Sequence, residues 1–152
     1  MLNRVEALKK EHGLLRVLLR ACEGASFVEL PGLLRQLHEA FASHQRTKEQ
    51  LYEDAASLCR ELQDASTLSL LSVFRLNLTI MSNAVLGFLT NVDSEPERLR
   101  QRFRTVADSL RSMMDVEEKS VFPLCLRQEA RSQRARTLSS QFVPAVRRMG
   151  DA

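Results

Sequence analysis

The sequence predicts an all-α protein: an up-down-up-down four-helix bundle with a short basic C-terminal extension. The first indication is composition. The 152 residues are 44% hydrophobic and include only five Gly and four Pro, which suits one compact domain and disfavours a loop-rich β fold. The second is the dominance of Leu, Ala, Arg, Glu and Gln, which are good helix formers. The third is an apolar residue every three or four positions along four long segments, the spacing of one buried helical face.

The first two predicted helices are separated by a Gly-Ala-Ser run at residues 24–26. The first helix covers about Asn3 to Cys22. The second begins near Pro31, which suits a first helical turn, and continues to about Leu62. Short breakers of this kind favour antiparallel neighbours in a bundle.

The third predicted helix covers roughly residues 67–89, and the fourth opens at Ser94. The run Ser-Glu-Pro-Glu from Ser94 matches a capping box with Pro inside the first turn. We expect this helix to end or kink at Pro123.

The sequence divides into a bundle at residues 1–126 and a basic tail at residues 127–152. The arginines of this tail are Arg127, Arg131, Arg134, Arg136, Arg147 and Arg148. We interpret it as a solvated, partly ordered C-terminus, with a docking arm for an acidic protein or nucleic acid as the alternative. Because the net charge is only +3, nucleic acid is not the partner that we expect.

Three well-separated cysteines, Cys22, Cys59 and Cys125, form no CxxC pair. This spacing supports neither a disulfide framework nor a zinc ribbon. Charged residues follow the first Met at once, so no secretory signal is expected. We therefore predict a cytoplasmic protein.

Four polar residues, His12, His44, Lys48 and Glu117, stand where the helical pattern requires apolar ones. His44 and Lys48 are four residues apart, and Met113 and Glu117 repeat that spacing. Buried ionisable groups are costly unless they are paired, so we expect these side chains to meet in the core. The chain offers too few ligands for two metal ions, because an ammonium cannot ligate and residues 68–89 contain no His, Asp or Glu.

These motifs resemble the hemerythrin-like (HHE) family of bacterial four-helix bundles over roughly residues 5–126. Residues 11–15, Glu-His-Gly-Leu-Leu, look like the first ligand helix of that family. His44 with the following Lys48-Glu49 and Leu51-Tyr52 looks like its second motif. Residues 113–123, with a paired Glu, an aromatic and a Pro, look like its last motif.

The resemblance implies ligand positions at His12 and His44 and a carboxylate position at Glu117. Lys48 stands where the family has a bridging Glu, and Met113 stands where it has His. The His ligands of the third helix have no counterpart, and Asn77 and Met81 lie in that neighbourhood.

We therefore predict a polar core cluster without a metal or other cofactor. Its members are His12, His44, Lys48, Met113 and Glu117. The alternative is iron held at a reduced site of His12, His44 and Glu117. Two interpretations of Lys48 stay open: its ammonium replaces metal charge beside Glu117, or it reaches the surface beside Glu49.

The third helix is apolar beyond one stripe, because residues 68–89 contain a single charge, Arg75. A helix with two apolar faces predicts a second contact surface, either a homodimer seam or a groove for a protein partner. The residues of this candidate face are Leu70, Val73, Ile80, Ala84 and Leu89. Its Asn and Ser residues disfavour a membrane span.

Neither a Ser/His/Asp or Cys/His catalytic set nor a Gly-rich phosphate loop stands out. We predict a non-enzymatic, metal-free regulatory module that acts by protein contact. An iron-binding oxygen or redox sensor is one alternative. Another follows from a weaker resemblance of residues 1–3, 34–53 and 115–119 to the regulator-of-sigma-D anti-sigma factors, which implies binding of a sigma factor.

Overall fold

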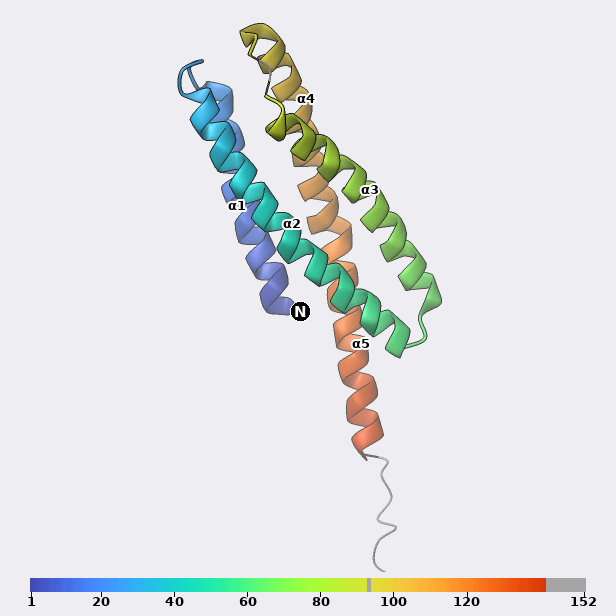
Figure 1. Ribbon diagram of the computed structural model, residues 1–152. Helices are drawn as coiled ribbons and strands as arrows, with labels where there is room; N and C mark the ends of the chain where they lie inside the picture. Colours follow the sequence, from blue (N-terminus) through green and yellow to red (C-terminus); the bar gives the residue numbers. More distant parts are fainter. Residues whose placement is uncertain (93, 142–152) are drawn as a thin grey trace, which may run out of the picture.

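A computed structural model describes residues 1–92 and 94–141 of the chain, and Figure 1 shows their arrangement. The elements are α1 (Leu2–Gly24), α2 (Leu30–Glu61), α3 (Ala65–Thr90), α4 (Pro96–Val116), the π-helical turn η1 (Glu117–Val121) and α5 (Phe122–Gln141). No strand occurs among the described residues. The helices α1 to α4 run side by side in alternating directions, so the predicted all-α bundle is confirmed (Figure 1).

The core forms where the apolar stripes of the helices face one another. On α1, Val5, Leu8, Leu15 and Leu19 are fully buried, at the spacing of three to four residues that places them on one face. Comparable stripes on α2, α3 and α4 pack against them in a single core cluster. Burial of this shared face from water stabilises the bundle.

The ends of α3 and α4 differ in how they are capped. Asp64 caps α3, because its side chain accepts a hydrogen bond of 3.0 Å from the backbone N–H of Thr67. The N-cap of α4 is Glu95, whose side chain makes no capping hydrogen bond. The predicted cap at Ser94 is therefore wrong by one residue, although Pro96 does occupy the first turn.

The turn η1 connects α4 and α5 into one long, continuous helix with little bend at η1 (Figure 1). Pro123 has no N–H, and its ring crowds the carbonyl one turn earlier. The helix is wider just before this residue, because the N–H of Phe122 donates a hydrogen bond to the carbonyl of Glu117, five residues back. The helix therefore distorts near Pro123 but continues beyond it.

Helix α5 extends into the segment from residue 127 that was predicted as a solvated, partly ordered tail. Residues 127–141 are helical, so the boundary drawn at residue 126 falls inside α5. Gln128 and Ser132 are buried, Arg131 pairs with Asp64, and Arg136 lies 3.0 Å from Glu61. Because polar side chains make these contacts between α5 and the bundle, a hydropathy pattern does not reveal them. Arg127 and Arg134 are exposed on α5, and Arg147 and Arg148 lie outside the described residues.

The three cysteines are buried and free. Burial raises the pKa of Cys22 to about 11 and that of Cys125 to about 12. Reactive cysteines are exposed and have a low pKa, so neither thiol has the character of a nucleophile.

Candidate functional site

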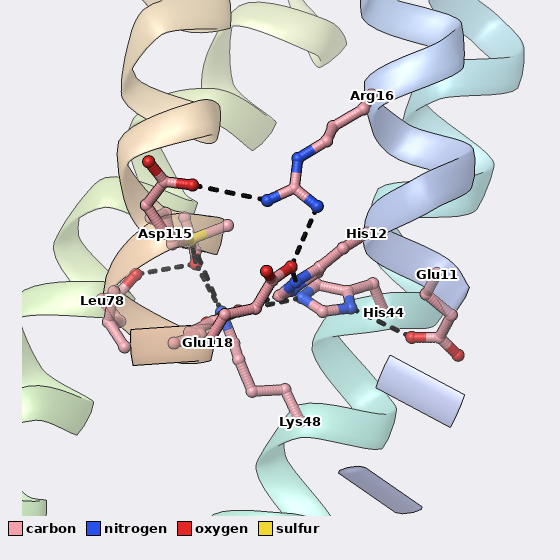
Figure 2. Close-up of polar contacts among 11 residues, drawn as sticks. Glu11, His12, Arg16, His44, Lys48, Leu78, Asp115 and Glu118 are labelled. Carbon is pink, nitrogen blue, oxygen red and sulfur yellow. Dashed lines mark hydrogen bonds and ion pairs between the residues drawn. The ribbon is translucent and has the colours of Figure 1, made fainter. Parts of the chain in front are cut away.

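Polar side chains from three elements meet midway along the bundle (Figure 2). His12 comes from α1, His44 and Lys48 from α2, and Glu117 is the first residue of η1. All four are buried. The structure thus brings together the residues that break the apolar stripes.

Glu117 is the centre of this cluster. Its Oε2 lies 2.9 Å from Nε2 of His12 and 3.4 Å from Nε2 of His44. Its Oε1 lies 2.8 Å from Nζ of Lys48. One buried carboxylate therefore faces two imidazoles and an ammonium.

Electrostatics keep Glu117 ionised. Burial acts to raise the pKa of this carboxyl group, but hydrogen bonding from His12, the neighbouring His44 ring and the Lys48 charge hold it well below its usual range. Because an ionised carboxylate only accepts hydrogen bonds, Nε2 of His12 is the donor in this contact.

A second set of charged residues holds the two imidazoles from the outside. Nδ1 of His12 lies 2.7 Å from Oε1 of Glu118, and Nδ1 of His44 lies 3.0 Å from Oε2 of Glu11. Arg16 in turn donates to Glu118 at 2.9 Å. Carboxylates on Nδ1 fix the orientation of each ring, an arrangement also found behind metal-bound histidines.

Sequence reasoning missed this outer set, which includes Glu11, Arg16, Asp115 and Glu118 (Figure 2). None of these residues lies on an apolar stripe, so periodicity gives no sign of them. The one available signal is adjacency, since Glu11 precedes His12 and Glu118 follows Glu117.

Lys48 points inward, so its interpretation as a surface residue beside Glu49 is wrong. Its Nζ lies 3.5 Å from Oγ of Ser82 and 3.5 Å from Sδ of Met113. The residue that α3 contributes to the site is therefore Ser82 rather than Asn77, which is exposed.

One further polar group, the hydroxyl of Tyr52, is buried close to the cluster. It has no hydrogen-bond partner among the described residues. Burial, followed by the charge of Glu117, raises the pKa of Tyr52. The phenol therefore remains neutral and adds no charge to the cluster.

Comparison with protein families gives a match over most of the chain. The model of the hemerythrin HHE cation binding domain matches residues 3–125, most of the chain. The chain belongs to the hemerythrin HHE cation-binding family. No curated protein and no solved structure matches it. The weaker resemblance to anti-sigma factors stays a prediction.

Two iron ions do not fit the donor set of this hemerythrin-like bundle. Such centres need several imidazoles and bridging carboxylates projecting from facing helices. Here Lys48 faces Oε1 of Glu117, and Ser82 and Met113 contact the Lys48 ammonium. An ammonium cannot ligate, and a thioether is a soft donor that does not suit this role.

A single divalent cation does fit by donor type. Donor atoms of His12, His44 and Glu117 lie within 4.8 Å of one another. Two imidazoles and one carboxylate with open positions are the ligand set of mononuclear non-heme iron. Within the described part of the chain, this is the one group of metal-binding side chains that meets these limits.

The candidate face on α3 is mostly exposed. Its exposed fractions are 46% for Leu70, 54% for Val73 and 60% for Ile80, and Ala84 is also exposed. The prediction is wrong for Leu89, which is only 6% exposed. This residue follows Phe88 on the core side of the helix. Leu76, 62% exposed, belongs to the face but was not predicted. By length and hydropathy, α3 is also the one described helix that could cross a membrane.

Proposed function

We propose that this hemerythrin-like bundle works without a di-iron centre, as a regulatory module that acts through protein contact. The observation that carries the proposal is the buried contact of 2.8 Å between Lys48 and Glu117. An ammonium supplies the positive charge that a metal would otherwise give to this carboxylate. The pair therefore supports a core that folds without an ion.

Hydrogen bonding around His12 supports the same interpretation. Its Nε2 contacts Glu117 at 2.9 Å, so this nitrogen has a protein partner without an ion. Its Nδ1 is held by Glu118. The ring thus acts as a cross-link between α1 and η1.

The contact surface that we propose is the outer face of α3. Hemerythrin-like domains are generally oxygen or iron binders rather than enzymes, and we propose that this chain is likewise not an enzyme. The free, buried cysteines support a reducing compartment, for which we propose the cytoplasm.

Metal content tests the proposal directly. Purified full-length protein from an iron-supplemented culture is analysed by plasma mass spectrometry and near-ultraviolet absorption. We expect iron far below one ion per chain and no charge-transfer band. Stoichiometric iron with such a band would contradict the proposal.

The second candidate function is binding of one metal ion at His12, His44 and Glu117, favoured by the convergence of their donor atoms. A bound ion would supply Lewis-acid or redox chemistry, held through Nε2 of each imidazole and a carboxylate oxygen. Titration of the purified protein with Co(II), followed by its visible bands, tests this candidate. Saturation at one ion that is lost in His44→Ala and retained in His38→Ala would establish it.

A further inference from the structure

The outer face of α3 carries no charged side chain along its whole length. The exposed positions of α3 are occupied by apolar, small or hydroxyl- and amide-bearing residues. The one charged residue of the helix, Arg75, turns to the flank, where it pairs with Glu49 and Glu53 of α2. A neutral face as long as this is unusual on a surface that contacts only water.

Six exposed positions on this face follow the spacing of a coiled-coil seam. They are Leu70, Val73, Asn77, Ile80, Ala84 and Gly87, and we call them the α3 seam. Their steps alternate between three and four residues, the repeat that keeps one face against a partner helix. The core contacts of α3, which include Leu71, Leu78 and Val85, lie on a different side of the helix.

The seam changes in size along its length. Its first two residues, Leu70 and Val73, are large, whereas its last two, Ala84 and Gly87, are small. Gly87 lies in the last turn of α3, and Gly within a helix is less favourable than Ala, by up to about 1 kcal/mol in the interior. Packing among the described residues does not explain this cost, because a Cβ at Gly87 would meet none of their atoms within 4 Å.

We propose that two copies of this chain associate through their α3 seams in antiparallel orientation. A two-fold axis between Leu78 and Thr79 places Leu70 against Gly87 of the second copy and Val73 against its Ala84. The same axis places Asn77 against Ile80 of the second copy. All three layers share this one axis, and in the two outer layers a large residue, Leu70 or Val73, meets a small one.

Self-complementarity favours a second copy over an unrelated protein. A two-fold interface requires one surface to match itself, and a neutral seam brings no like charges together across the axis. The seam spans about 26 Å at roughly 1.5 Å per residue. Asn77 near the axis is a polar seam residue, which in coiled coils can fix register at a cost in stability.

The pairing rests on the contact role proposed above for α3 and identifies its partner. It is independent of the metal content of the core. Iron at His44 would overturn the metal-free role and leave the seam intact, whereas a monomer would overturn the pairing and leave the ion pair of Lys48 intact.

Light scattering coupled to size exclusion measures the association of the full chain. We expect twice the mass of the 17.3 kDa chain. Val73→Glu and Ala84→Lys should each weaken association about 100-fold or more, since each buries an unpaired charge. The double variant should form dimers again, because each new Glu then faces a new Lys of the second copy.

Val17→Glu is the matched control, since Val17 is an equally exposed Val on α1, and it should remain dimeric. Circular dichroism confirms that each variant is folded. A monomeric wild type, a dimer insensitive to Val73→Glu, or a double variant that stays monomeric would overturn the proposal. A monomer that floats with phosphatidylcholine–phosphatidylglycerol vesicles would assign the face to a membrane instead.

Discussion

Nζ of Lys48 and Oε1 of Glu117 lie 2.8 Å apart in the interior of the bundle, where both side chains are buried. Breaking one partner of a buried ion pair leaves the other charge without compensation, whereas replacing both can be nearly neutral. The folded protein therefore depends on Lys48 to compensate the buried charge of Glu117.

Lys48→Met tests this dependence. We expect it to lower the free energy of unfolding by about 3 kcal/mol, measured by urea denaturation. Lys9→Met is the control, because the exposed Lys9 pairs only with Glu6 on the surface and should change stability by less than about 0.5 kcal/mol. The double variant Lys48→Met/Glu117→Gln should regain part of the loss. If Lys48→Met is as stable as the wild type, Glu117 does not need the ammonium.

Lys48→Glu should make the bundle responsive to metal. This variant places a second carboxylate beside Glu117 and removes the cation, so repulsion destabilises the metal-free protein. Fe(II) or Co(II) then relieves that repulsion, and we expect the melting temperature to rise by roughly 5–10 °C on metal addition. Thermal melts with and without metal measure the shift. The wild type and Lys48→Met should show little response, and an equal rise in Lys48→Met would contradict this account.

Acid should weaken the fold through Glu117. Because the pKa of this carboxyl is lowered in the folded state from an ordinary value of 4.5, its stabilising contribution is present above about pH 4.5 and is lost as pH falls further. Urea denaturation midpoints between pH 7 and pH 3 should therefore decline below pH 4.5. Glu117→Gln should decline less steeply, with a residual slope from Glu118 and Asp64, whose pKa values are also lowered. Equal slopes for the two proteins would argue against this origin.

The inner cluster could be predicted from the sequence because each member interrupts an apolar stripe. His12, His44 and Glu117 are polar residues at positions that packing assigns to the core, so their burial follows from periodicity alone. Lys48 was ambiguous because a long side chain at a stripe position can also reach the surface. The position of Glu117, known only from the structure, explains why the Lys48 side chain points into the core.

The outer carboxylates could not be predicted by the same route. Glu11 and Glu118 lie at the edge of the apolar stripe, where side chains ordinarily face water. The π-helical turn adds a second difficulty, since Glu117 and Glu118 both contact the single ring of His12. Helical periodicity does not anticipate a local widening that Pro123 favours.

The part of α5 beyond residue 126 could not be predicted from hydropathy because its described contacts with the bundle are polar. A chain that ends at residue 126 should therefore lose stability, although the sequence assigned the bundle to residues 1–126. It would lack Gln128, which donates to Asp64 at 3.3 Å, and Glu129, which lies 2.8 Å from the amino group of Met1. We expect a loss of about 2 kcal/mol, measured by urea denaturation, since these contacts are partly buried and each contributes about 1 kcal/mol. Arg134→Ala in the full chain removes an exposed side chain of the same helix and should leave stability unchanged. A truncated chain as stable as the full one would show that α5 adds nothing to the bundle.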